Sequence, residues 1–480
     1  MIKQIELIPE TETSHPYARA AVKCKFEERG FLEEEYFLHG TANVYETRQG
    51  MLAVAAQGAP YVNRILIRRP KDPEKFSENV VVEILNATNY MDIDRVWVLV
   101  REKMMRDGDI YVGITSKPCT IPVMQKFDPA RYAPLSWKNP RKPTRPDNEL
   151  GVMAGASRGE TEDGLFWDML RELPGALRDQ NLSPLKEFLP FHIYLAGWSQ
   201  SGGYMLRFME SFAYRTEEEI RCPIYDGYFS TGAAAVGLPG LNQEESPWAC
   251  APDKEKPGFL QKAYQPFMEI HTETENVRLG NLALRREDSD AEDFKYRAYD
   301  IPGASHDTKD NMVDWYYLDP DLPSTGIFPN YSGKEPYPND YPYNFIFHRC
   351  LNMLFTWARE GKKPPVIGRI PVDFAEHNAT DENGNALGGW RTAFLEYPTC
   401  TYHIYSTPLK PDFAFGCTCF GYKEPFSQSE LEQRYKSLEN YRKLVSEMAK
   451  RQVQEGLLEP ADEENYVDTA VRFAAEGGLR

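Results

Sequence analysis

Residues 191–204 read FHIYLAGWSQSGGY. This stretch begins as an apolar, β-rich run that stops at Gly197. Ser199 stands on the turn that follows, and Gly202 and Gly203 then open a segment whose apolar residues recur at helical spacing. The pattern predicts a buried strand, then a sharp turn that carries one serine, then a helix.

This combination is typical of a nucleophile elbow. There the serine takes strained backbone angles, so that its hydroxyl projects above the sheet, and small residues flank it two positions away on each side. Gly197 satisfies one side and Ser201 approximates the other. We therefore interpret Ser199 as a nucleophile. The N–H of Gln200, at the positive end of the predicted helix, is the first expected donor to an oxyanion.

The composition indicates a globular protein with ample material for a core, since 41% of its 480 residues are hydrophobic and 13% are aromatic. The formal net charge of −17 repels nucleic-acid phosphates and anionic membranes, so we expect neither as a partner. No apolar run approaches the roughly 20 residues that cross a bilayer, and the start of the chain lacks a signal-peptide core. We therefore expect a cytoplasmic protein.

The cysteines and histidines give no sign of a metal site. The eight cysteines are scattered without a C-x-x-C pair, which favours free thiols. His306, Asp307 and Asp310 lie close together in the sequence, but their spacing is not that of a helical ligand pair. We predict neither a metal nor a cofactor.

The first part of the chain alternates strands and helices. Near period-two alternation in 31–45 and 61–69 predicts antiparallel strands. The apolar run 80–86 predicts a central parallel strand, followed by a helix over 93–106 and a strand over 110–115. This βαβ rhythm predicts an α/β fold with a mostly parallel sheet, and with active residues at the carboxyl ends of its strands.

Later segments complete this expectation. We predict further elements in the following places: a helix over 163–173 that Pro174 ends or kinks, strands over 222–231, 266–271 and 294–301, a helix over 345–359, and a helix from the capping box at Ser427 to Met448. We expect a single domain over 1–480. The insertions 118–160, 233–262 and 308–344 show no regular core element and are predicted to gather over the elbow as a cap or lid.

His306 follows the last predicted core strand and is the candidate base. A carboxylate between Ser199 and His306 would complete the order nucleophile, acid, base, which is the order of α/β hydrolases. Three carboxylates are candidates: Glu275 just past a strand end, Glu273 nearer that strand, and Asp226 on the preceding strand. We favour Glu275 and keep the other two as alternatives.

The second oxyanion donor is expected from the loop that leaves the strand 80–86. Ala87 and Thr88 are the two candidates, because in α/β hydrolases the equivalent loop supplies this N–H. Trp198 and the aromatic loops suggest a substrate whose acyl or alcohol group is apolar or aromatic.

Several segments together resemble one family. They are Tyr61–Pro70 with its paired arginines, Val82–Asn86, Gly197–Gly202, Thr272–Glu275, Pro302–His306 and Gly388–Arg391. In this order they look like the bacterial "alpha/beta hydrolase domain" family of carboxylesterase-like serine hydrolases. The resemblance implies an α/β-hydrolase fold with Ser199 and His306 as nucleophile and base, although the family commonly has aspartate where Glu275 stands.

The resulting hypothesis is hydrolysis of a small-molecule carboxylic ester through an acyl-enzyme, with Ser199 as nucleophile, His306 as base and a carboxylate that orients the imidazole. The same fold also hosts acyltransferases and lyases, and a catalytically inactive relative could simply bind a ligand. Both alternatives stay open at this stage.

Overall fold

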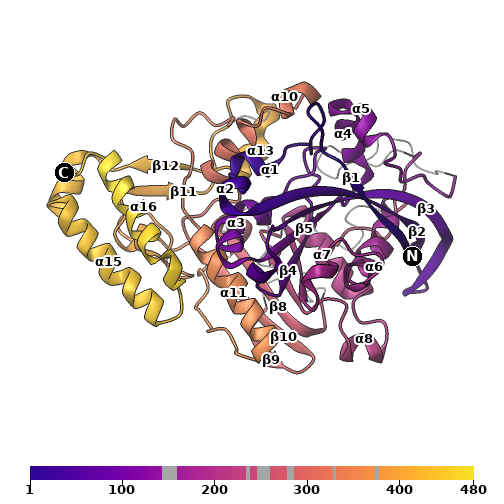
Figure 1. The fold of residues 1–480 in the computed structure, drawn as a ribbon. Helices are drawn as coiled ribbons and strands as arrows, with labels where there is room; N and C mark the ends of the chain where they lie inside the picture. The colour runs from indigo at the N-terminus through magenta and orange to yellow at the C-terminus, as the bar shows by residue number, and fades with distance from the viewer. Residues whose placement is uncertain (143–158, 234–237, 246–259, 278–285, 328–330, 373–377) are drawn as a thin grey trace. The chain divides into compact units, whose positions relative to one another are not determined.

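The computed structural model describes all residues except 143–158, 234–237, 246–259, 278–285, 328–330 and 373–377 (Figure 1). The chain divides into two compact units. The first unit comprises Met1–Met268, Ala283–Tyr296 and Asp319–Phe328, and the second comprises Glu269–Leu282, Arg297–Leu318 and Pro329–Arg480. Within the described part, no helix combines the length and the apolar character needed to cross a membrane.

A ten-stranded sheet has the order β1-β2-β3-β5-β4-β6-β7-β8-β10-β9. The strands are β1 (Ile2–Ile8), β2 (Phe31–Arg48), β3 (Met51–Pro70), β4 (Asn79–Ile84), β5 (Ile110–Ile114), β6 (His192–Trp198), β7 (Gly227–Thr231), β8 (Ala263–Thr272), β9 (Ser289–Ala291) and β10 (Phe294–Ile301). The pairs β4–β5, β4–β6 and β6–β7 are parallel, whereas β1, β2 and β3 form antiparallel pairs at one edge. The predicted α/β class with a mostly parallel central sheet is confirmed.

The central strands are buried because helices cover the sheet. Every residue of β4, β5 and β7 is buried, as the mostly apolar runs of β4 and β5 require. The helix α3 (Arg95–Asp107) packs on β5 and β6, and α7 (Gln200–Ser211) packs on β4, β6 and β7. The other helices of the first unit are α1 (Ala20–Lys23), α2 (Phe26–Arg29), α4 (Ile121–Phe127), α5 (Pro129–Tyr132), α6 (Phe166–Arg178), α8 (Glu217–Arg221) and α10 (Leu322–Thr325).

The sequence predicts that Pro174 ends or kinks the helix that contains it. The helix α6 continues through Pro174 to Arg178, so the proline does not end it, and the kink stays a prediction. Proline lacks the N–H that would bond to the carbonyl four residues earlier, which belongs to Leu170. The hydroxyl of the buried Tyr225 donates to that carbonyl at 2.7 Å. A tertiary hydrogen bond therefore replaces the missing helical one.

The second unit carries the C-terminal helices, two of which, α15 and α16, lie side by side in Figure 1. Its helices are α9 (Glu273–Val277), a π-helix (Lys309–Tyr317), α11 (Asn344–Glu360), α12 (Ala393–Glu396), α13 (Ala414–Cys419), α14 (Gln428–Tyr435), α15 (Leu438–Gln454) and α16 (Glu463–Glu476), and β11 (Cys400–His403) pairs with β12 (Tyr422–Pro425).

The single helix predicted from Ser427 to Met448 is two helices. The predicted capping box is present, because the Ser427 hydroxyl accepts from the N–H of Glu430. The helix breaks at Lys436, whose φ of +68° is outside the helical region, and Ser437 caps the next helix by accepting from the N–H of Asn440. The helical spacing of the apolar residues continues across Lys436, so the break could not be predicted from that spacing.

Two of the proposed insertions contain regular structure, contrary to expectation. Segment 118–160 includes α4 and α5, and segment 308–344 includes the π-helix and α10. Parts of all three insertions, among them 143–158, 234–237, 246–259 and 328–330, lie outside the described residues. A cap over the elbow therefore stays a prediction.

Candidate active site

Ser199 sits at the turn between β6 and α7 with φ +56° and ψ −119°. A positive φ in a residue other than glycine costs about 1–3 kcal/mol, and such strain is typical of functional turns. Between Ile193 and Met209, Ser199 is the one residue that is not buried. The backbone thus presents this side chain, and no other of the segment, to the surface.

Close backbone packing explains the residues beside the serine. A Cβ on Gly197 would lie 2.5 Å from the carbonyl oxygen of Ser201, so a larger residue cannot fit there without moving the main chain. Ser201 fits where the elbow pattern prefers glycine, because its hydroxyl accepts from the N–H of Trp198 and donates to the Trp198 carbonyl, both at 2.9 Å. The side chain therefore closes the turn.

Trp198 itself belongs to the core. Its side chain is 1% exposed, and the Arg95 guanidinium lies 5.0 Å from its ring centre. The suggestion from the sequence that Trp198 indicates an aromatic substrate group is therefore not supported.

The two loop candidates for an oxyanion donor differ. The N–H of Thr88 donates to the side-chain oxygen of Asn86 at 2.8 Å and is thus engaged. Ala87 is fully buried, its carbonyl accepts from the N–H of Tyr90 at 3.0 Å, and its own N–H makes no hydrogen bond within the described residues. Gln200, the third predicted donor, is the first residue of α7. These contacts favour Ala87 over Thr88.

His306 and Glu275 come together in the second unit. Glu275 lies in α9, directly after β8, and His306 lies on the loop after β10. The Nδ1 of His306 contacts Oε1 of Glu275, while Oε2 of Glu275 accepts from the N–H of Thr272. Glu275 is fully buried and His306 is 5% exposed. A carboxylate in this position can hold the imidazole tautomer with its proton on Nδ1.

Thr274 ties the histidine loop to the rest of the second unit. Its hydroxyl accepts from the N–H of His306 at 3.1 Å and donates to the carbonyl of Ile404 at 3.0 Å. Reasoning from the sequence missed this residue, although its place between Glu273 and Glu275 was a usable signal.

The two alternative acids have other partners. Glu273 accepts from the N–H of Gly303 at 2.7 Å and from the amide of Asn378 at 2.6 Å, and burial raises its pKa. Asp226 accepts from the N–H of Ile193 at 2.7 Å, near the amino end of β6, and from Arg178 at 3.0 Å. Asp226 directly precedes β7, which begins at Gly227, later than predicted, and it lies at the opposite end of β6 from Ser199.

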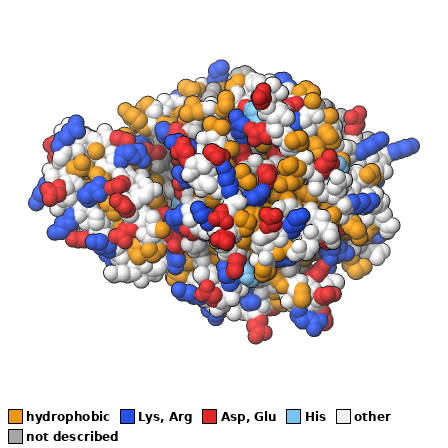
Figure 2. Space-filling view, viewed as in Figure 1, with side chains coloured by type: hydrophobic (Ala, Val, Ile, Leu, Met, Phe, Trp, Pro, Cys, Tyr) orange, Lys and Arg blue, Asp and Glu red, His pale blue; other side chains and the backbone are white. Residues whose placement is uncertain are grey.

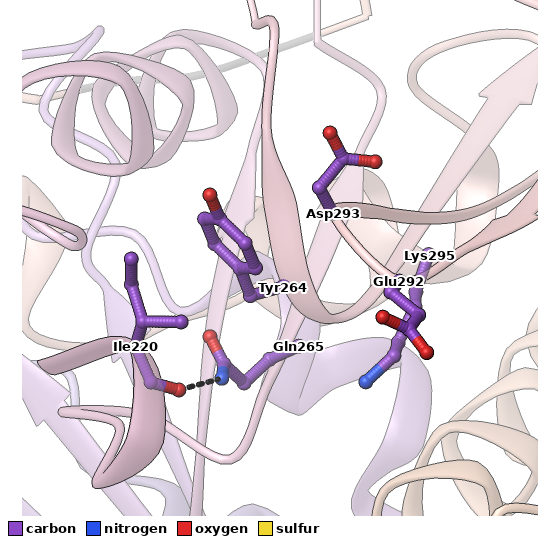
Figure 3. Close-up of a pocket in the computed structure, with 6 residues that line it drawn as sticks. All are labelled: Ile220, Tyr264, Gln265, Glu292, Asp293 and Lys295. Atoms are coloured by element: carbon purple, nitrogen blue, oxygen red, sulfur yellow. Dashed lines mark hydrogen bonds between the residues drawn. The ribbon is translucent and has the colours of Figure 1, made fainter. Parts of the chain in front are cut away.

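An open hollow of about 550 Å³ in the first unit is lined by Ile220, Tyr264, Gln265, Glu292, Asp293 and Lys295 (Figure 3). Its one internal hydrogen bond runs from the Gln265 amide to the carbonyl of Ile220, at 3.5 Å. The hollow lies at the amino ends of β8 and β10, whereas ligands of α/β sheets bind beyond the carboxyl ends. We therefore do not assign it to the reaction.

The distribution of charge is mixed on the face of the molecule that is drawn in Figure 2. Acidic and basic side chains are interspersed there and form no patch of one sign. Among the residues that the structure describes, no group of three or more His, Cys, Asp or Glu side chains could hold a metal ion.

The chain is similar, at low sequence identity, to solved structures of hydrolases, among them the following three. An esterase from Rhizomucor miehei is 10% identical and covers 74% of this chain and 94% of its own, with a TM-score of 0.33. A lipase/esterase from Lactobacillus plantarum is 8% identical (54% and 91% covered, TM-score 0.30), and an a/b serine hydrolase from Xanthomonas campestris is 10% identical (55% and 84% covered, TM-score 0.27).

No curated protein matches the chain. The family model described as "Alpha/beta hydrolase domain" matches residues 4–468, nearly the whole sequence. The chain therefore belongs to the alpha/beta hydrolase domain family.

Proposed function

We propose that this protein is a serine hydrolase that cleaves a carboxylic ester of a small molecule through an acyl-enzyme. The observation that carries the proposal is the strained, accessible Ser199 in the first unit. The buried contact between His306 and Glu275 in the second unit supports it, because a histidine oriented by a carboxylate is the base that such a serine requires.

In the proposed mechanism, Nε2 of His306 takes the proton of Ser199 as the serine oxygen attacks the ester carbonyl. The Glu275 carboxylate holds the imidazole orientation and stabilises the imidazolium. The imidazolium then protonates the leaving alcohol, and a water molecule activated by the same histidine hydrolyses the acyl-enzyme. No metal or cofactor takes part in these steps.

The oxyanion of each tetrahedral intermediate would be bound by two backbone N–H groups, those of Gln200 and Ala87. Gln200 directly follows the nucleophile at the start of α7, where the helix dipole adds positive potential. Ala87 is preferred to Thr88 because the N–H of Thr88 already donates to Asn86.

The proposal includes carboxylesterase-type specificity, a single catalytic domain capped by the three insertions, and a cytoplasmic location. Family membership leaves the substrate open, because one fold hosts many reactions. Acyl transfer to an acceptor other than water uses the same first half-reaction, and is distinguished by the product formed when alcohols are supplied.

A serine-directed fluorophosphonate tests the proposal on the full-length protein. We expect stoichiometric, irreversible labelling, with the adduct mapped by mass spectrometry to the peptide that contains Ser199. We also expect hydrolysis of p-nitrophenyl esters of short to medium acyl length. Labelling of Ser199 with transfer to added alcohol, and no release of free acid, would favour an acyltransferase.

A wild-type protein that is neither labelled nor active on any ester of the series would contradict the proposal and favour a ligand-binding relative. The matched control is Ser199→Ala, which should remain folded and unlabelled.

A further inference from the structure

Asn86 is a buried side chain at the point where the strand β4 gives way to the loop that carries Ala87. It is 3% exposed, and its backbone pairs with Ile93 through two hydrogen bonds of 3.0 and 2.9 Å. The amide nitrogen of Asn86 donates to the carbonyl of Trp198 at 3.0 Å. Its amide oxygen accepts from the N–H of Thr88 at 2.8 Å. One side chain thus bonds both to the elbow and to the adjacent loop.

The register of the sheet explains how Asn86 reaches the elbow. In the parallel pair β4–β6, Ile84 lies opposite Gly197. Asn86 and Ser199 each stand two residues beyond these partners, so the two chains leave the sheet side by side. On the other flank, Trp198 of β6 lies opposite Thr231 of β7. Ser199 is therefore bracketed by the ends of two neighbouring strands.

These contacts hold both ends of the peptide group between Trp198 and Ser199. Its carbonyl oxygen accepts from the amide of Asn86 and from the hydroxyl of Ser201, at 3.0 and 2.9 Å. Its N–H donates to the carbonyl of Thr231 at 2.8 Å. Rotation of this peptide group would change φ of Ser199, which is held at a strained +56°. Asn86 therefore resists relaxation of the nucleophile.

The second hydrogen bond of Asn86 shapes the loop. An asparagine oxygen that accepts from the N–H two residues later forms an Asx turn. This turn engages the N–H of Thr88, and the next bond along the loop joins the N–H of Tyr90 to the carbonyl of Ala87. The N–H of Ala87 is thereby left as the unengaged donor of the two candidates.

We propose that Asn86 is a positioning residue that couples the orientation of the nucleophile Ser199 to that of the oxyanion donor on Ala87. This inference rests on the proposed function. Its chemical basis is that the two amide atoms of asparagine differ: the nitrogen donates to the elbow, and the oxygen accepts from the loop.

Two variants separate these bonds. Asn86→Asp keeps an acceptor for the N–H of Thr88 but loses the donor to the Trp198 carbonyl, and Asn86→Ala loses both. A misplacement of about 1 Å at a reacting group can cost about 10²-fold in rate. We therefore expect kcat for p-nitrophenyl acetate to fall by about 10- to 100-fold in the first variant and by about 100-fold or more in the second. KM should change by less than about threefold.

Asn63 provides a matched control. It is fully buried on β3, its amide donates to the carbonyl of Thr115 at 3.0 Å, and its oxygen accepts from the Trp137 ring N–H at 3.3 Å. Asn63→Asp keeps the acceptor for Trp137 and loses the donor to Thr115, just as Asn86→Asp loses only the donor to Trp198. It should lower thermal stability while kcat stays within about threefold of wild type. Equal kcat losses in the Asn63 and Asn86 variants would overturn the inference.

A measurement that does not depend on enzymatic activity separates the inference about Asn86 from the proposed function. Hydrogen–deuterium exchange should become about fivefold faster or more in Asn86→Ala, in peptides that cover both 84–93 and 194–203, but not in Asn63→Ala, which also loses both of its side-chain bonds. If the wild type is active and the Asn86 variants retain its kcat, the inference is wrong and the proposed function stands. If the wild type is inactive, unchanged exchange in 194–203 overturns the inference by itself.

Discussion

The elbow around Ser199 and the pair formed by His306 and Glu275 are held in different ways. The elbow is held through its main chain: the peptide group before the serine bonds to Asn86, Ser201 and Thr231. The histidine is held by the side chains of other residues: Glu275 contacts its ring, and the Thr274 hydroxyl accepts from its backbone N–H. The first region stores backbone strain, whereas the second places a carboxylate in a buried position.

This difference indicates which kind of substitution should disable each region. The strained backbone of Ser199 persists only while the surrounding contacts hold it. Small packing changes near the elbow should therefore act by moving Ser199. A buried carboxylate acts through its charge and its acceptor atoms, so an isosteric neutral replacement should be enough to disable it. The following predictions use this contrast, in order of decreasing effect on turnover.

The largest effect is expected from Ser199→Ala, which removes the attacking oxygen without adding bulk. Turnover of p-nitrophenyl acetate should fall by about 10⁴–10⁶-fold. The melting temperature should not fall, because alanine removes no bond that holds the turn. If this variant hydrolysed p-nitrophenyl acetate at the wild-type rate, the serine mechanism would be wrong.

The second effect concerns the acid. Glu275→Gln should lower kcat by about 10³–10⁴-fold with little change in KM, because the neutral amide no longer stabilises the imidazolium. Steady-state kinetics of the purified variants is the measurement. Glu273→Gln and Asp226→Asn are the controls, and both should retain kcat within about tenfold. A collapse in either control together with an active Glu275→Gln would move the acid to that residue.

Thr274→Val should have a moderate effect, since it leaves the His306 N–H and the Ile404 carbonyl without their shared hydroxyl. Each unpaired buried group costs about 1–3 kcal/mol of stability, and the loop should shift to relieve that cost. Because a misplacement of about 1 Å can cost about 10²-fold in rate, a smaller shift of His306 should lower kcat by about 5- to 50-fold. Thr274→Ser keeps the hydroxyl and should behave almost as wild type. If serine and valine reduced kcat equally, packing rather than hydrogen bonding would position the histidine loop.

The smallest effect on turnover, less than about threefold, is expected from Glu83→Gln. The Glu83 side chain supports the elbow region only indirectly. This fully buried carboxyl accepts from the N–H groups of Val96 and Trp97 at the start of α3, and from the Tyr111 hydroxyl. Burial raises the pKa of Glu83 to about 8. The folded state therefore binds this proton more tightly than the unfolded chain does, and the resulting stability is present in full only below the unfolded pKa.

That stability should be lost as the pH rises from about 5 towards 8, at up to about 1.4 kcal/mol per pH unit. Glu83→Gln cannot titrate, so the free energy of unfolding of the wild type relative to the variant should decline over this range. Urea unfolding at pH 5, 6, 7 and 8 measures the difference. A constant difference across these pH values would show that Glu83 is ionised throughout.

Much of the architecture could be predicted because it depends on local patterns. The apolar run of β4 and the helical stripe of α3 were recognised to within about two residues, since burial on a sheet or on one helix face imposes a period on the sequence. The errors have tertiary causes. Tyr225 supplies the bond that lets α6 pass Pro174, and the break at Lys436 interrupts an apolar period that continues beyond it.

The elbow could be recognised from the sequence, because its glycines, its serine and the apolar strand before it are contiguous and their conformation is set by neighbouring residues. The sequence also supplied the order of the residues proposed as nucleophile, acid and base. Which carboxylate meets His306 depends on tertiary packing, because Glu275 is 31 positions from His306 and Glu273, two residues earlier, accepts instead from Gly303 and Asn378. The hydrogen bond from Asn86 to Trp198 was likewise not predictable, since a contact across 112 positions depends on the register of β4 with β6, which no local period encodes.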